Sequence, residues 1–251
     1  MTDYIIEFGT EKFAKVFEPC IDAYGSGDPE ETEWPNNVLS NQTVVYDSGV
    51  IARRSDSVVH RVDPEELARC ERLAKAAASV MGSFPVGMKS EGNDPFHPYF
   101  QVVSVDAHGA PPGPPKVIDA AFVRKLFGHC IAPFDRVFVE PLREGGFVWK
   151  ESETDVEEDE VEPEEWAMIG PEHVLARWRK LIEFFEASDE LVLPSFAAIG
   201  FYEYKAPAGA SLGDRAEPSQ FEMKGSCLPR MPFAFTHAGS LVGLFGHVVW
   251  T

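Results

Sequence analysis

The last twenty residues constrain the fold of this chain more than any other stretch. Residues 231–250 read MPFAFTHAGSLVGLFGHVVW, two apolar runs joined by small residues, which is typical of a β-hairpin. In the second run, alternate side chains would point to opposite faces of a strand, and both sets are apolar. A strand with two apolar faces needs cover on both of them. We therefore expect the C-terminal strand to lie inside a sheet.

Two segments have strong helical patterns. A capping Asp63, apolar residues at helical spacing and a terminal Gly82 predict a helix over residues 64–81. Residues 171–187 carry a continuous apolar stripe, with Arg177 predicted on the opposite, polar side. With the strands, these segments predict an α+β fold, in which a mixed or mainly antiparallel sheet packs against two principal helices.

The remaining elements are shorter. A helix from Thr10 is expected to end at Pro19, because proline disrupts a helix interior. A second short helix is expected over residues 119–127, and residues 93–99 are expected to form a rigid loop that carries His97. Strand patterns occur at residues 4–8, 43–46, 48–52, 57–62, 100–105, 136–140, 147–150, 191–193, 197–204 and 221–224, and Pro194 is expected to separate two of them.

An acidic segment interrupts the chain at residues 151–165, which contain ten Asp and Glu residues and no Lys or Arg. Its charge and its lack of apolar periodicity favour a linker or a surface loop. The chain is thus divided into an α+β half, 1–150, and a half with a helix and antiparallel strands, 166–251. One continuous domain that includes both halves is the alternative.

The net charge of −19 excludes several classes of partner. Nucleic acid and anionic membrane surfaces both require Lys and Arg clusters, so neither is expected as a ligand. No apolar stretch approaches the ~18 residues of a membrane span, and the first residues do not resemble a signal peptide. The four cysteines form no CxxC pair and are interpreted as reduced thiols. These features predict a cytoplasmic protein.

Motifs for cofactors and metals are not found in the sequence. There is no GK[ST] phosphate loop, no HExxH, no GxSxG and no spaced Cys/His quartet. The acidic segment fails as an EF-hand, because counting from Asp155 places Glu160 where glycine is needed and Trp166 where a bidentate Glu is needed. We therefore expect no cofactor and no metal.

Three residues are candidates for catalysis: His97, Cys227 and His237. Functional side chains concentrate in loops, and a cysteine thiolate beside a histidine would be a nucleophile for a hydrolase or a transferase. Two of them also have a simpler interpretation, His97 as a turn residue and Cys227 as a small buried thiol. His247, within the terminal strand, is interpreted as a buried core histidine.

The leading hypothesis is a soluble acidic protein that binds a basic protein partner, as an immunity or inhibitor protein would. The partner-binding residues are then expected in the acidic segment: Asp155, Glu157, Glu158, Asp159, Glu160 and Glu162. Such charge speeds association and sets specificity. The alternative is a hydrolase or transferase whose active site is assembled from loops. A third hypothesis is a subunit of a homo-oligomer.

Overall fold

The structure is a computed structural model that describes residues 2–5, 11–21, 38–56, 59–86, 88, 90, 92, 94–133, 135–152, 162, 166–167, 170–200 and 227–249. Its centre is a five-stranded antiparallel sheet in the order β5–β9–β8–β7–β6. The strands are β5 (His97–Gln101), β6 (Val137–Pro141), β7 (Leu191–Ile199), β8 (Cys227–Thr236) and β9 (Leu241–Val249). Strands from both halves of the sequence thus form one sheet.

The C-terminal strand has the position that its pattern predicts. β9 lies between β5 and β8, and all of its residues except Val249 are buried. A four-residue turn after Thr236 joins it to β8, where the N–H of Thr236 donates to the carbonyl of Ser240 at 2.8 Å. The predicted α+β fold with a mainly antiparallel sheet is therefore confirmed.

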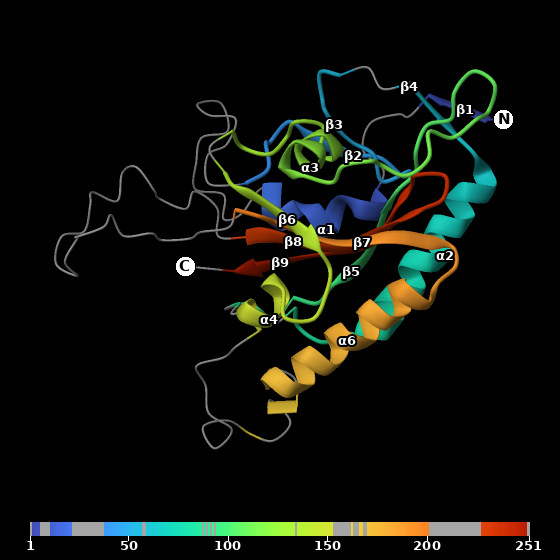
Figure 1. Cartoon of the computed structure of the whole chain (residues 1–251). Helices are drawn as coiled ribbons and strands as arrows, with labels where there is room; N and C mark the ends of the chain where they lie inside the picture. Colours follow the sequence, from blue (N-terminus) through green and yellow to red (C-terminus); the bar gives the residue numbers. More distant parts are fainter. Residues whose placement is uncertain are drawn as a thin grey trace.

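Helices cover both faces of this sheet (Figure 1). On one face lie α2 (Pro64–Met81) and α6 (Pro171–Ala187), and the ring of Trp178 contacts Phe196 edge-on at 5.9 Å. On the other face lie α1 (Glu11–Ile21) and α3 (Ala120–Leu126), and the ring of Phe17 lies 4.1 Å from that of Phe245. The phenylalanine-rich core thus fills two layers, one on each side of the sheet.

Local signals explain why the two long helices form where they do. The side chain of Asp63 accepts the N–H of Glu65 at 3.0 Å, Pro64 opens α2, and Gly82 ends it at φ 73°. The second helix begins at Pro171, as predicted. Arg177 was predicted on its polar side, but it is buried, and its guanidinium lies 4.7 Å from the ring centre of Phe84. The long stem of arginine permits this burial.

Two short ribbons complete the described structure. β1 (Thr2–Ile5) pairs with β4 (Val59–Val62), and β2 (Thr43–Val45) pairs with β3 (Ile51–Arg53). The first of these strands was expected at residues 4–8, and residues 6–8 lie outside the described part of the chain. The strand expected at 221–224 and the end of that expected at 197–204 also lie outside it.

Two predicted breaks, at Pro19 and at Pro194, are wrong because tertiary contacts outweigh the local signal. The helix α1 continues through Pro19 to Ile21. Proline removes one helical hydrogen bond there, but Phe17 and Cys20 on either side are fully buried and hold the turn in place. β7 likewise continues through Pro194, which sits at a β-bulge beside Leu193 at φ 57°.

The segments around His97 and Phe147 also differ from the predictions. The strand expected at residues 100–105 is β5, which begins three residues earlier, so His97 lies in a strand and not in a loop. Residues 147–150 were expected as a strand but begin the short helix α4 (Phe147–Glu151). The N–H of Phe147 donates to the carboxylate of Glu140, and the Phe147 ring stacks on Phe196 at 5.6 Å. These contacts fix a helical start that the strand-like sequence does not predict.

Candidate functional site

The three predicted catalytic residues lie at three different positions along the sheet. His97 begins β5 opposite Phe245, and Cys227 begins β8 opposite Val249. His237 lies in the turn at the other end, where β8 passes into β9. At ~3.3 Å per residue, β9 spans roughly 26 Å between these ends. Cys227 and His237 therefore lie at opposite ends of β9, and His97 lies opposite its middle residue, so the structure does not bring the three together.

His237 has a structural contact at its own end. Its Nε2 atom lies 2.9 Å from the backbone carbonyl oxygen of Asp189, in the turn between α6 and β7. The imidazole is exposed to solvent. This contact links two turns at the same edge of the sheet, and it gives His237 a positioning role in the fold.

His247 lies near the end of the sheet where β8 begins at Cys227, and two residues along β9 from Phe245, the partner of His97. Its Nε2 atom lies 3.2 Å from Oδ2 of Asp94, and the His247 side chain is only 8% exposed whereas that of Asp94 is 53% exposed. Burial lowers the pKa of His247, the charge of Asp94 opposes that change, and the charge of His97 adds to it. The imidazole is therefore neutral at neutral pH and retains one nitrogen that can accept a proton.

The strand register places Cys227 diagonally from His247. Cys227 is opposite Val249 and Pro229 is opposite His247, so Cys227 and His247 lie on the same face. Diagonal residues of this kind have Cα atoms about 7–8 Å apart. The predicted interpretation of His247 as a buried histidine is correct, but sequence reasoning missed its neighbour. The signal was available, because counting back from the turn pairs residue 227 with residue 249.

A second thiol lies on the same side of the sheet. Cys20 of α1 is fully buried, and its backbone carbonyl accepts the N–H of Leu39 at 3.2 Å. Burial raises the pKa of Cys20 well above its usual value, and the nearby Cys227 and Asp94 raise it further. Cys20 is thus a neutral thiol. Cys227, His247 and Asp94 remain the residue types of a nucleophile, a base and an orienting acid.

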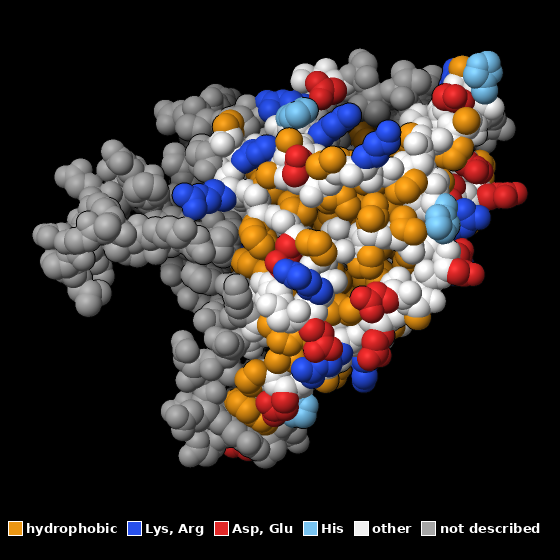
Figure 2. Space-filling model, in the orientation of Figure 1, with side chains coloured by type: hydrophobic (Ala, Val, Ile, Leu, Met, Phe, Trp, Pro, Cys, Tyr) orange, Lys and Arg blue, Asp and Glu red, His pale blue; other side chains and the backbone are white. Residues whose placement is uncertain are grey.

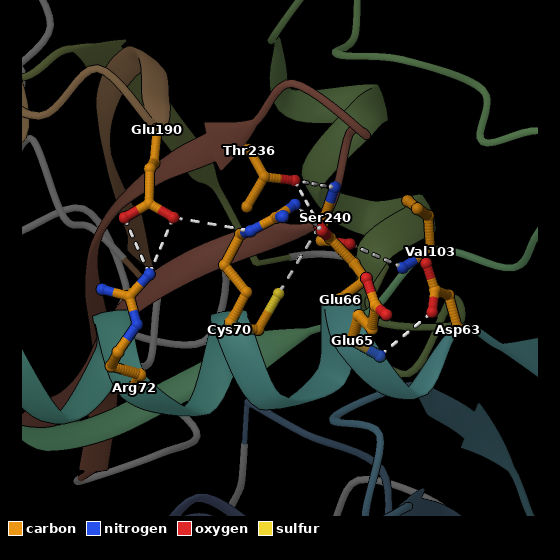
Figure 3. A network of polar contacts seen from close by, with 10 residues as sticks. Asp63, Glu65, Glu66, Cys70, Arg72, Val103, Glu190, Thr236 and Ser240 are labelled. Carbon is orange, nitrogen blue, oxygen red and sulfur yellow. Dashed lines mark hydrogen bonds and ion pairs between the residues drawn. The ribbon is translucent and has the colours of Figure 1, made fainter.

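A buried network around Glu66 occupies the opposite end of the sheet (Figure 3). Oε1 of Glu66 accepts the hydroxyl of Thr236 at 2.5 Å, and that hydroxyl oxygen accepts the N–H of Ser240 at 3.1 Å. Oε2 of Glu66 pairs with the guanidinium of Arg69 at 2.8 Å. Ser240 in turn accepts the N–H of Val103 at 3.1 Å through its own hydroxyl. The network joins α2 to the β8–β9 turn.

The same network reaches the turn before β7. Glu190 accepts two hydrogen bonds of 2.7 Å from Arg72 and lies 3.4 Å from Nε of Arg69. The Cys70 thiol lies within 3.8 Å of Glu66, and burial together with that carboxylate raises the pKa of Cys70 to about 12. Both oxygens of Glu66 therefore have partners, and the thiol is neutral. This arrangement fixes the fold and leaves no acceptor oriented toward a ligand.

The predicted partner-binding residues lie mostly outside the described part of the chain. This applies to Asp155, Glu157, Glu158, Asp159 and Glu160. Glu162 is described, is exposed, and accepts the N–H of Trp166 through its carbonyl at 2.9 Å. The elements on either side of this segment are α4 and α6, which lie close together (Figure 1).

An ion pair also connects the two sides of the acidic segment. The guanidinium of Arg179 in α6 lies 3.4 Å from Glu144 and 6.0 Å from the ring of Trp149 in α4. The N–H of Trp166 Nε1 donates to Glu172 at 2.9 Å at the start of α6. The chain therefore leaves and re-enters the described structure near one corner of the molecule.

Among the described residues, no three His, Cys, Asp or Glu side chains are grouped so that they could hold a metal ion. No helix in the described part of the chain is long and apolar enough to span a membrane. No protein-family model matches the sequence, and no curated protein matches it either.

Proposed function

We propose that this chain is an acidic protein-binding protein that holds a basic protein partner, in the manner of an immunity or inhibitor protein. The distribution of its charge supports this proposal above all. Residues 151–165 contain ten acids and residues 22–37 contain five more, and neither segment contains Lys or Arg. These two segments carry 15 of the 19 net negative charges, so the rest of the chain is close to neutral.

Charge concentrated in this way has a specific physical effect. It attracts cationic surfaces over a distance set by salt, about 8 Å at physiological ionic strength, and it can raise association rates by 10- to 1,000-fold. A basic partner also removes the repulsion between the neighbouring carboxylates. We expect the partner to be cationic, and we expect the complex to weaken steeply as salt increases.

A charge-neutral variant tests the proposal. Asp155, Glu157, Glu158, Asp159 and Glu160 would be changed to Asn or Gln, and a control variant would neutralise five exposed acids of the helices, Glu18, Glu65, Glu172, Glu183 and Glu186. Proteins captured from native lysate at 50 mM salt would be quantified against capture at 500 mM salt. A basic protein captured by the parent and the control, but not by the segment variant, supports the proposal. Equal capture by both variants, or no capture by the parent, contradicts it.

A hydrolase or transferase is the second candidate, favoured by the side-by-side placement of Cys227, His247 and Asp94. In this mechanism His247 takes the thiol proton as the sulfur of Cys227 attacks a carbonyl carbon, whose C=O π bond opens to an oxyanion. The oxyanion then collapses, the bond to the leaving group breaks, and the leaving group takes the proton from His247, while Asp94 orients the imidazole. Iodoacetamide labelling of Cys227 should then slow in a His247→Asn variant. A Cys130→Ser variant should label Cys227 at the parent rate. Equal labelling in the parent and the His247→Asn variant contradicts this candidate.

The proposal extends to the cellular compartment and the oligomeric state of the chain. All four cysteines are buried, and thiols kept away from solvent support a reducing compartment such as the cytoplasm. Assembly into a homo-oligomer remains a third proposal, and the mass of the chain at micromolar concentration, by light scattering, tests it against the 27.8 kDa monomer.

A further inference from the structure

We propose that residues 110–117 dock into another protein, in a groove that is lined with aromatic side chains and carries carboxylates at one end. The residues read Ala-Pro-Pro-Gly-Pro-Pro-Lys-Val and are called the proline segment below. The segment belongs to no helix or strand and leads into α3. This inference goes beyond the proposed function, because it concerns a different part of the chain and a partner that recognises proline.

The four prolines at positions 111, 112, 114 and 115 decide which conformation this segment favours. A proline ring restricts its own φ to about −65°, and it favours an extended conformation in the residue before it. Such runs adopt the polyproline II helix, which has three residues per turn and no internal hydrogen bonds. A segment of this kind loses little conformational entropy when it binds, and aromatic-lined grooves recognise it.

The fold holds both ends of the proline segment and leaves its middle exposed. The carboxylate of Asp106 accepts the N–H of Ala110, and the carboxylate of Asp119 accepts the N–H of Phe122 in α3, each at 2.8 Å. Val117 is 65% exposed, the highest value of any large apolar residue in the described part of the chain. The other exposed residues between the two anchors are Ala110, Pro111, Pro112, Pro114 and Lys116. Packing in the core therefore does not account for these apolar side chains.

The period of three residues sorts the side chains of a polyproline II helix onto three edges. The first edge comprises Pro111, Pro114 and Val117, the second Ala110, Gly113 and Lys116, and the third Pro112 and Pro115. A groove that contacts the first two edges meets two proline rings, one valine and one lysine. The third edge then faces away from the partner. The two pairs of prolines thus have different roles, although their side chains are identical.

The lysine determines which charge the groove should carry. Lys116 is the only Lys or Arg in residues 106–119, it is exposed, and the last turn of α3 carries Arg124 and Lys125. Figure 2 shows Lys and Arg side chains gathered around the place of α3 in Figure 1. The chain is acidic as a whole, but the surface beside the proline segment is mostly basic. Carboxylates beside the aromatic side chains of the groove therefore complement it.

Gly113 departs from the polyproline II conformation and shows what must change on docking. Its φ is +76°, whereas polyproline II requires about −75°. Its N–H donates to the carbonyl of Ala238 in the β8–β9 turn at 3.0 Å, the one backbone hydrogen bond between residues 111–117 and the rest of the described chain. Glycine adopts both signs of φ readily. Rotation at Gly113 therefore releases one hydrogen bond and aligns the two proline pairs in one helix.

The test uses an SH3 domain with carboxylates beside its aromatic groove, titrated into the full chain by isothermal titration calorimetry. Pro111→Ala and Pro114→Ala each remove a ring from the groove and should weaken binding by about tenfold or more. Pro112→Ala and Pro115→Ala are the matched controls, because their rings face away. Binding of each control should stay within about threefold of the parent, since the substitution only frees one backbone angle.

Gly113→Ala tests the rotation in the opposite direction. The space around Gly113 is empty, so a methyl group meets no neighbour, but alanine is strained at φ +76°. Alanine should therefore favour the straight form of the proline segment and tighten binding by about fivefold. In the parent, the amide resonance of Gly113 should shift on binding as its bond to Ala238 breaks. Unchanged or weaker binding of Gly113→Ala overturns the rotation and with it the proposed docking geometry.

Lys116 gives a third readout. Lys116→Ala should weaken binding by about two- to fivefold, as expected for an exposed ion pair, and Lys116→Arg should bind like the parent. Equal losses for the two pairs of proline variants, or no binding of the parent at millimolar SH3 domain, overturn the inference. The variant with neutralised acids in residues 155–160 should bind the SH3 domain like the parent. The proline segment and the acidic segment can thus fail independently.

Discussion

Thr236→Val tests the buried network around Glu66. Valine has nearly the shape of threonine, so the change removes one hydroxyl and leaves little new space. The lost hydroxyl donates to Glu66 at 2.5 Å and accepts the N–H of Ser240 at 3.1 Å. Glu66 keeps Arg69 at 2.8 Å, so its charge is not left unpaired. The variant therefore isolates the link between α2 and the β8–β9 turn.

The expected loss follows from the two hydrogen bonds. A hydrogen bond to a charged group contributes about 1.5–3 kcal/mol, and a buried N–H left without a partner costs about 1–3 kcal/mol. Because the two effects overlap at one atom, we expect Thr236→Val to lower the free energy of unfolding by about 2–4 kcal/mol. A typical domain has a total of about 5–15 kcal/mol, so this loss is readily measured.

Thr43→Val is the matched control. Thr43 is also buried, but its hydroxyl has no hydrogen-bond partner among the described residues. The same substitution there should change stability by less than about 0.5 kcal/mol or increase it, because it removes an unsatisfied polar atom. Urea unfolding at pH 7, followed by circular dichroism, gives both values, with equal slopes indicating equal exposure on unfolding.

The difference in free energy of unfolding between the two variants tests whether the Glu66 network stabilises the fold. A loss for Thr236→Val within 0.5 kcal/mol of that for Thr43→Val would refute the role given to the network. A double-mutant cycle with Glu66→Gln supplies a second check, because residues that share a hydrogen bond should show a coupling energy above about 0.5 kcal/mol.

Three further predictions concern titration and backbone geometry. Burial raises the pKa of Asp135 to about 6, so the folded state holds this proton more tightly than the unfolded state. The parent then loses stability as pH rises from about 4 to 6, and Asp135→Asn should be more stable by about 1–3 kcal/mol at pH 7 but not at pH 4, in urea titrations at both pH values. Burial lowers the pKa of His247, so the parent should lose stability as pH falls below about 6.5, and His247→Gln should lose less between pH 7 and 5. Gly49→Ala places a methyl group against the carbonyl of Phe100 at φ 79° and should lower the melting temperature far more than Gly145→Ala, where φ is 72° and the space is open. Similar shifts for the two alanine variants would contradict the role of close approach.

The sequence by itself determined the elements whose signals are local. The cap at Asp63, the stop at Gly82 and the apolar spacing between them fixed α2 correctly. The doubly apolar pattern of the C-terminal strand correctly predicted its place inside the sheet. Capping, periodicity and burial on two faces depend on residues a few positions apart, so they are visible in the sequence.

Tertiary structure alone decided the elements whose signals are distant or contradictory. Phe147 begins a helix because Glu140 and Phe196 hold it, although its neighbours favour a strand. α1 continues through Pro19 because the burial of its neighbours outweighs one lost hydrogen bond.

The candidate site depended on tertiary structure even more strongly. Asp94 reaches His247 across 153 positions of sequence, and Glu66 reaches Thr236 across 170. The register of the five strands sets which side chains meet, and the packing of the whole core sets that register. For this reason the sequence indicated His97, Cys227 and His237 only as separate candidates, and the fold alone showed that Cys227 lies near His247 and apart from His237.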